Sequence, residues 1–309
     1  MKTETFAVVG SGGFQLPATL WLPEKTTRAV LQVTHGMTEH MGRYTKLAKV
    51  LTTCGIAVAG FDLRGHGRNG AASACASFGE KGWDATLEDM HLFRKHLEER
   101  FDRLPLFMLG FSLGSFLLRE YFSRYGTEGV HGAIILGTGH QPEKVLRPMM
   151  AVVKGQMKKC GFDGTTPLVH KLSFDTYNQK ITHRRTRADW LCSDDDELDA
   201  YLADPLCRES ISAGLFWQLL DAMRRTGAND AYDNWDKALP VLLLSGADDP
   251  VGDYGKGVER VDVVMRNAGF NRMETMLFPI VRHDILHEEH SSTAPRLRTM
   301  IASFIVKYM

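Results

Sequence analysis

A Gly-x-Ser-x-Gly pentapeptide at residues 110–114 contains Ser112, the residue best placed in this chain to act as a nucleophile. The apolar run Leu106–Leu109 before it predicts a strand buried on both faces, and residues 115–125 after it have the apolar spacing of a helix. A serine on a sharp strand-to-helix turn presents its hydroxyl group outside the fold, and the flanking glycines let neighbouring backbone pass closely. The position therefore predicts a nucleophilic serine.

A serine nucleophile needs a base, a group that orients the base, and donors for the oxyanion. Asp248 and Asp249 follow the apolar run Val241–Leu244, and a carboxylate at a strand end can hold an imidazole in one tautomer. His283 follows the β-rich run at 273–278 and is the candidate base. The order serine, aspartate, histidine is that of hydrolases with a nucleophile elbow. At this point both aspartates are candidates for the acid.

The oxyanion donors are expected from two loops. The apolar run Ala29–Thr34 leads into His35, Gly36 and Met37, where the glycine lets the loop approach the nucleophile. We expect the backbone N–H groups of Met37 and Leu113 to form the oxyanion hole, each contributing about 2.7–4 kcal/mol as in comparable enzymes. In isolation, this loop would suit an ordinary strand-to-helix turn equally well. The residues expected to support both loops are His35, Gly36, Gly110 and Gly114.

Metal chemistry has weaker support in the sequence. His283 and His287 are four residues apart and could share a helix face, but the pattern is not His-Glu-x-x-His and shows no third ligand. The acidic run Asp194–Glu197 is typical of a solvated helix start. We therefore expect neither a metal nor a cofactor.

Apolar runs alternate with segments of helical periodicity along most of the chain, which predicts an α/β fold with a mostly parallel sheet covered on both faces. The predicted strands are 18–22, 29–34, 56–61, 106–109, 133–136, 241–244 and 273–278, and the predicted helices are 44–51, 84–101, 115–125 and 298–308. Ligands of such sheets bind beyond the carboxyl ends of the strands. Each candidate catalytic residue follows one of these strands.

The alternation stops between residues 141 and 237, a stretch too long to be a loop. Methionines and aromatic residues are interspersed there with charges at helix-like spacings. This stretch is expected to be a helical cap inserted over the strand ends. The hydrolase core is accordingly expected at 1–140 and 238–309, and the cap at 141–237.

The composition argues against several classes of partner. Lys+Arg and Asp+Glu both number 37, so no basic excess is available to neutralise the phosphates of a nucleic acid. The five cysteines are scattered without a Cys-x-x-Cys pair, as expected for free thiols in an intracellular protein. The first residues lack a signal-peptide pattern, and no apolar run approaches the roughly 20 residues of a membrane span. We expect a cytoplasmic protein without integral membrane contact.

These motifs together resemble the α/β-hydrolases, specifically the hydrolase-4 branch of monoacylglycerol lipases, lysophospholipases and "serine aminopeptidases". The resemblance is carried by His35-Gly36-Met37-Thr38-Glu39-His40, Arg43-Tyr44, Asp62-Leu63-Arg64-Gly65-His66-Gly67, Gly110–Gly114, Gly246-x-x-Asp249, and His283 with Ile285-Leu286-His287-Glu288. It covers nearly the whole chain and implies the α/β-hydrolase fold with about eight strands. It favours Asp249 over Asp248, because the family's acid stands three residues after the glycine. Where family members commonly have a serine, this chain has Arg68-Asn69, which we interpret as structural.

The residues and the resemblance predict a serine hydrolase that cleaves carboxylic esters through an acyl-enzyme. Ser112 would attack the carbonyl, His283 would act as base and then acid, and Asp249 would orient His283. The resemblance implies monoacylglycerols, lysophospholipids or similar single-chain acyl esters as substrates. Two alternatives are an aminopeptidase or amidase, which would need an acidic site such as Asp194–Glu197 for the α-amine, and a non-catalytic ligand-binding homologue.

Overall fold

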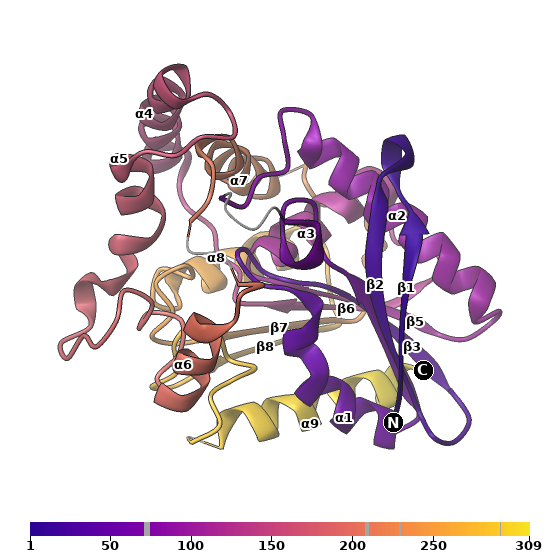
Figure 1. The fold of residues 1–309 in the computed structure, drawn as a ribbon. Coiled ribbons are helices and arrows are strands. Elements are labelled where there is room, and N and C mark those ends of the chain that lie inside the picture. The colour runs from indigo at the N-terminus through magenta and orange to yellow at the C-terminus, as the bar shows by residue number, and fades with distance from the viewer. Residues whose placement is uncertain (71–74, 208–209, 229, 291) are drawn as a thin grey trace.

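The computed structural model describes residues 1–70, 75–207, 210–228, 230–290 and 292–309. Within these ranges, eight strands form one sheet in the order β1-β2-β4-β3-β5-β6-β7-β8 (Figure 1). The strands are β1 (Lys2–Val9), β2 (Gln15–Leu22), β3 (Ala29–Thr34), β4 (Ile56–Phe61), β5 (Leu106–Phe111), β6 (Val130–Leu136), β7 (Val241–Gly246) and β8 (Met273–Phe278). The pairs β1·β2 and β2·β4 are antiparallel, and the other pairs are parallel. The expectation of a mostly parallel sheet of about eight strands is confirmed.

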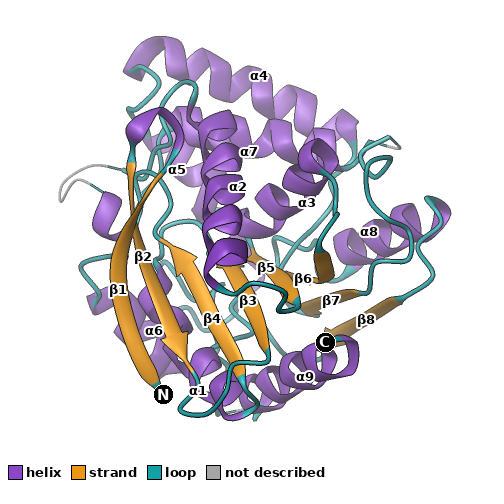
Figure 2. Cartoon of the chain, turned by 90° about the vertical axis from the view of Figure 1, so that its right-hand side faces the viewer, coloured by secondary structure: helices purple, strands orange, loops and turns teal. Residues whose placement is uncertain are grey.

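Helices cover both faces of the sheet (Figure 2). On one face lie α1 (Thr45–Thr53) and α9 (Thr293–Tyr308), and on the other lie α2 (Gly82–Arg100), α3 (Leu113–Tyr125) and α8 (Lys256–Asn267). Every residue of β3, β5 and β7 is buried, because each of these strands is covered on both sides. This double burial explains why these strands read as continuous apolar runs.

The described residues between β6 and β7 are predominantly helical, as the sequence predicts. The helices are α4 (Glu143–Cys160), α5 (Pro167–His170), α6 (Asp195–Ala203) and α7 (Ala213–Thr226), with one-turn elements at Lys171–Asp175 and Tyr177–Lys180. Other short 3₁₀ turns occupy Ser11–Gly13, Met41–Tyr44 and Gly67–Asn69. Helix α7 packs against both α4 and α3, so the insertion is joined to the core through α3.

Two details of the sequence interpretation are corrected. Asp194 does start a helix, since its side chain caps α6 by accepting from the Glu197 N–H (3.3 Å), but the residue is 2% exposed and not solvated. His283 and His287 lie in the loop after β8 and not on a helix face. Asp194 is buried because the loop after β8 also binds it: the His290 N–H donates to its carboxylate (3.0 Å).

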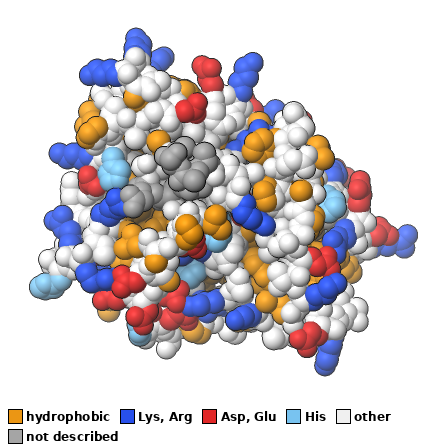
Figure 3. Space-filling view, viewed as in Figure 1, with side chains coloured by type: hydrophobic (Ala, Val, Ile, Leu, Met, Phe, Trp, Pro, Cys, Tyr) orange, Lys and Arg blue, Asp and Glu red, His pale blue; other side chains and the backbone are white. Residues whose placement is uncertain are grey.

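The surface seen in Figure 3 carries acidic and basic side chains interspersed, in keeping with their equal numbers in the sequence. The five cysteines are free thiols. Within the described ranges, no helix combines the length and the apolar character needed to cross a membrane.

Candidate active site

Ser112 lies on the turn between β5 and α3, in a strained backbone conformation with φ 52° and ψ −118°. A left-handed φ is costly for a non-glycine residue, and it turns the side chain away from the strand. The turn is also tightly packed: a Cβ on Gly110 would lie 2.3 Å from the Gly114 carbonyl oxygen, and one on Gly114 would lie 2.1 Å from the Thr34 carbonyl oxygen. Both glycines are therefore required by close backbone approach, as the sequence predicts.

The structure brings Ser112, His283 and Asp249 together in one hydrogen-bonded chain. The Ser112 hydroxyl donates to His283 Nε2 (2.8 Å), and His283 Nδ1–H donates to Asp249 Oδ2 (2.9 Å). His283 is 1% exposed and Asp249 is fully buried. Because Nδ1 faces a carboxylate, the imidazole is held in the tautomer that leaves Nε2 free to accept the serine proton.

The two candidate acids differ sharply in their surroundings. Asp249 also accepts hydrogen bonds from the Ser245 hydroxyl (3.1 Å) and the Val251 N–H (2.8 Å), which fix its carboxylate. Asp248 is an exposed residue whose backbone N–H donates to the Val281 carbonyl. The geometry therefore assigns the histidine partner to Asp249.

The loop after β3 lies directly against the serine turn. A Cβ on Gly36 would lie 3.0 Å from both Glu39 Oε1 and the Phe111 ring, so a side chain there would force one of these neighbours to shift. Glu39 Oε1 accepts from the Gly36 N–H (2.6 Å). The next N–H along the chain, that of Met37, takes no part in this hydrogen bond. Leu113 begins α3, where backbone N–H groups have no partner within the helix. The two predicted oxyanion donors thus come from adjacent backbone segments.

His35 supports this loop as a neutral ring. Its Nδ1–H donates to the Gly36 carbonyl (2.7 Å), and its Nε2 accepts from the Leu63 N–H (2.9 Å). Burial lowers the pKa of His35 to about 4, and burial also lowers the pKa of neighbouring His66 to about 3. Both histidines are fully buried, and their ring centroids are 5.6 Å apart.

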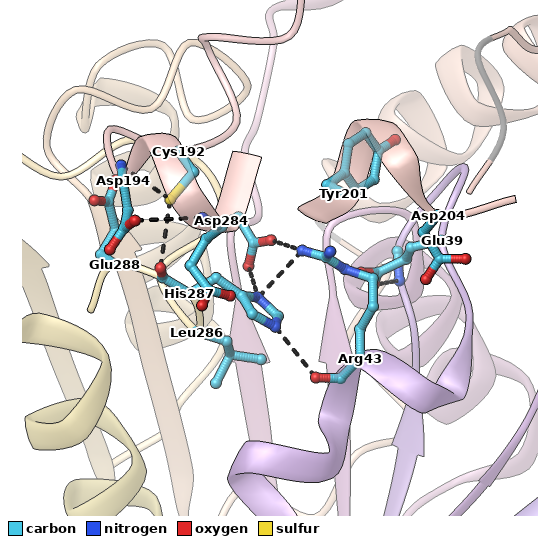
Figure 4. A network of polar contacts seen from close by, with 12 residues as sticks. Glu39, Arg43, Cys192, Asp194, Tyr201, Asp204, Asp284, Leu286, His287 and Glu288 are labelled. Atoms are coloured by element: carbon cyan, nitrogen blue, oxygen red, sulfur yellow. Dashed lines mark hydrogen bonds and ion pairs between the residues drawn. The ribbon is translucent and has the colours of Figure 1, made fainter. Parts of the chain in front are cut away.

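A buried ionic network, which the sequence did not reveal, joins the loop after β3 to the loop that contains His283 (Figure 4). Arg43 donates through Nε to Glu39 (3.0 Å) and through Nη2 to Asp284 (2.5 Å). His287 Nδ1 lies within hydrogen-bond distance of Asp284 Oδ1 (2.8 Å), and its Nε2 lies within hydrogen-bond distance of the Arg43 carbonyl oxygen (3.1 Å). Burial alone would raise the pKa of Asp284, but His287 and Arg43 outweigh it and hold this pKa well below its usual range. The motif residues around Arg43 thus have a structural use beside the triad.

A pocket between the cap and the core adjoins the site. It is lined by Thr38, His170, Phe174, Arg187, Ala188, Trp190, Leu191, Tyr201, Leu202 and Cys207. Thr38 follows Met37, the predicted oxyanion donor, and the Trp190 ring lies 5.2 Å from the His283 ring between centroids. The lining mixes apolar side chains, such as Phe174, Trp190 and Leu202, with polar and charged ones, such as His170, Arg187 and Tyr201.

Among the described residues, two groups of side chains lie close enough to be considered for a metal ion: His40, Asp204 and Cys207, and Asp194, Asp196 and His290. In the first group, His40 Nδ1 accepts from the Gly42 N–H (3.1 Å), so Nε2 carries the proton and donates to Asp204 (2.9 Å). Burial raises the pKa of Cys207 to about 12, which keeps its thiol protonated. In this structure His40 and Asp204 of the first group form a hydrogen bond between the core and the inserted segment.

Comparison with known proteins gives consistent matches. The family model described as serine aminopeptidase, S33 (Hydrolase_4) matches residues 25–290. The monoacylglycerol lipase of Mycolicibacterium smegmatis is 24% identical over 90% of this chain and 89% of its own length. The human monoglyceride lipase is 26% identical over 80% of this chain and 73% of its own length. A crystal structure of a carboxyl esterase from Bacillus coagulans in complex with glycerol covers 100% of this chain and 99% of its own, with TM-score 0.89 and 25% identity.

Proposed function

Because the chain belongs to the serine aminopeptidase S33 (Hydrolase_4) family, we propose that it hydrolyses carboxylic esters through an acyl-enzyme formed on Ser112. The observation that carries the proposal is the hydrogen-bonded chain from the Ser112 hydroxyl through His283 to buried Asp249, with distances of 2.8 and 2.9 Å. The lipase and esterase relatives support the same reaction class.

In this mechanism, Ser112 Oγ attacks the ester carbonyl carbon while His283 Nε2 takes the hydroxyl proton. The Met37 and Leu113 N–H groups stabilise the oxyanion of the tetrahedral intermediate. Its collapse breaks the bond to the alcohol oxygen, which receives the proton from His283. Water then attacks the acyl-enzyme, with His283 again acting as base, and releases the carboxylic acid and free Ser112. Asp249 stabilises the imidazolium ion in both halves.

We further propose single-chain acyl esters, such as monoacylglycerols or lysophospholipids, as the substrates. Two relatives are a monoacylglycerol lipase and a monoglyceride lipase, and the pocket beside His283 has apolar walls from Phe174, Trp190 and Leu202. A helical cap over 141–237 and a core of 1–140 with 238–309 are the domain division that fits this proposal.

The test is hydrolysis of p-nitrophenyl esters from acetyl to palmitoyl by the wild type and by Ser112→Ala. We expect a rate maximum at medium or long chains that Ser112→Ala abolishes, with the thermal midpoint preserved. A maximum at acetyl or butyryl would keep the mechanism and replace the lipid substrate by short-chain esters. Hydrolysis that persists in Ser112→Ala would refute the assignment of the nucleophile.

The acid is tested separately with two matched variants. Asp249→Asn should lower kcat by about 10⁴-fold, the loss seen when a triad aspartate is replaced and the histidine adopts the wrong tautomer. The control Asp248→Asn should stay within a few-fold of the wild type, because Asp248 is exposed. The reverse ranking would transfer the role to Asp248.

The alternatives from the sequence gain no support from contacts at Asp194. Its carboxylate accepts from the N–H groups of Glu197 and His290, whereas Asp195 and Asp196 of the same acidic run are exposed. Aminoacyl p-nitroanilides discriminate an aminopeptidase from an esterase. A fluorophosphonate that fails to label Ser112 in the folded protein would instead indicate a non-catalytic homologue.

A further inference from the structure

The imidazole of His283 has an aromatic neighbour from each part of the molecule. Phe111, in the core, lies 5.1 Å away between ring centroids, and Trp190, between the cap helices, lies 5.2 Å away. Trp190 is only 6% exposed, and Tyr177 packs on it at 4.8 Å. The catalytic ring is therefore in contact with a cap side chain that is itself fixed in place.

The backbone around Trp190 is also hydrogen-bonded to the loop of the catalytic histidine. The His283 N–H donates to the Trp190 carbonyl (3.4 Å), and the Asp284 N–H donates to the Leu191 carbonyl (2.6 Å). The Arg282 guanidinium donates to the carbonyls of Asp189 (2.7 Å) and Cys192 (2.9 Å). Three consecutive residues of the histidine loop thus use cap carbonyls as acceptors.

The carboxylate of Glu288 adds a further contact between the histidine loop and the cap. Glu288, which is 1% exposed, accepts from the Ser193 N–H (2.9 Å) and from the Ser193 hydroxyl (2.5 Å). Cys192 Sγ donates to the His287 carbonyl (3.5 Å), and both Cys192 and Asp194 are buried at this contact (Figure 4). Separating the two segments without admitting water would leave these buried donors and acceptors unpaired, which is costly. The hydrogen bonds therefore hold the two segments together.

From these contacts we infer that the cap segment Asp189–Asp194 positions His283 for catalysis, with Trp190 as the positioning residue that contacts the ring. The inference rests on the proposed function. It adds that displacement of this segment from the core impairs catalysis by His283 as well as disrupting the pocket. The geometry of a general base is demanding, since a misplacement of about 1 Å can cost 10²-fold in rate.

The test separates positioning from pocket lining by comparing a short and a long substrate. Trp190→Ala should lower kcat for p-nitrophenyl acetate and p-nitrophenyl octanoate by the same factor, at least about tenfold, with little change in KM for the acetate. Fluorophosphonate labelling of Ser112 should slow in parallel. Trp190→Phe retains a ring and should recover most of kcat. Trp217→Ala removes a cap indole from α7, away from the histidine loop, and should stay within about twofold of the wild type.

A second variant keeps the inference testable if Trp190→Ala does not fold. Ser193→Ala removes the hydroxyl that donates to Glu288 and leaves the pocket lining intact, so kcat should fall for both esters with KM unchanged. If Trp190→Ala, or Ser193→Ala where Trp190→Ala does not fold, retains the acetate kcat and loses rate only with octanoate, the segment only lines the pocket and the inference is overturned. If the wild type shows no Ser112-dependent hydrolysis of either ester, the proposed function fails first, and the inference fails with it.

Discussion

Mild acid should destabilise this protein through two buried histidines near the oxyanion loop. Burial lowers the pKa of His35 to about 4 and that of His66 to about 3, from 6.5 for an unperturbed histidine. His35 resists protonation geometrically as well, because its Nε2 already accepts from the Leu63 N–H (2.9 Å). Both rings must therefore stay neutral in the folded state, whereas in the unfolded chain they bind protons freely below pH 6.5.

The sign and size of the change in the free energy of unfolding follow from this difference in protonation between the folded and unfolded states. Between pH 6.5 and the lowered pKa values, the unfolded state binds more protons, so the free energy of unfolding falls as the pH falls. Each histidine loses about 1.4 kcal/mol per pH unit in this window, or about 2 kcal/mol at pH 5. Together the two histidines lower the free energy of unfolding at pH 5 by about 4 kcal/mol relative to pH 7 and above. Carboxylates with lowered pKa values, such as that of Asp62, reduce the free energy of unfolding only when the pH falls below their usual pKa, which is 3.8 for an aspartate.

The assay is urea denaturation at pH 7.5, 6.5, 5.5 and 5.0, with His66→Phe as the matched variant. Phenylalanine keeps a ring next to Phe78 and His35, whose rings lie 5.5 and 5.6 Å from that of His66. We expect the variant to lose only about 2 kcal/mol over the same range, whatever its stability at pH 7.5. A free energy of unfolding that is constant from pH 7.5 to 5.0, or a variant with the wild-type pH dependence, would refute the reasoning.

Two further predictions concern close packing and the buried ions. Gly114→Ala should abolish hydrolysis and cost about 1–3 kcal/mol of stability, measured by denaturation, because its Cβ would lie 2.1 Å from the Thr34 carbonyl oxygen. Arg43→Met should cost about 3–5 kcal/mol, because it strands buried carboxylates such as Asp284. The exposed pair of Arg124 makes Arg124→Met a control that should cost at most about 1 kcal/mol, and equal losses in the two variants would contradict the prediction.

The strands that are easiest to predict are those that are buried along their whole length. Strands β3, β5 and β7 are covered on both faces, so their sequences are continuous apolar runs. Strand β1 was not predicted, because its burial alternates between exposed and half-buried residues and it lies at the edge of the sheet. Helix α8 was also missed, although its buried residues Val258, Val261 and Met265 recur at helical spacing and could have predicted it.

The candidate triad could be assembled from the sequence because each of its residues follows a strand whose end lies at the same edge of the sheet. The ionic network could not, because no catalytic pattern links Arg43 to Asp284 in the sequence, and their contact depends on how two loops pack. The contact between Trp190 and His283 was equally hidden. An indole in a stretch of helical spacing reads as cap core, and only the fold shows that it faces the catalytic ring.

The same cap stretch also contacts the second catalytic loop. Thr38, next to the oxyanion residue Met37, has φ 63°, a conformation that is costly for a β-branched residue. Its hydroxyl is hydrogen-bonded to that of Tyr201 in α6 (2.8 Å), and two residues later His40 donates to Asp204 (2.9 Å). The strain at Thr38 is thus offset by contacts that the core alone does not provide. Since residues 189–204 touch both loops beside the serine, substitutions in this stretch should change the rate of the chemical step and the substrate preference together.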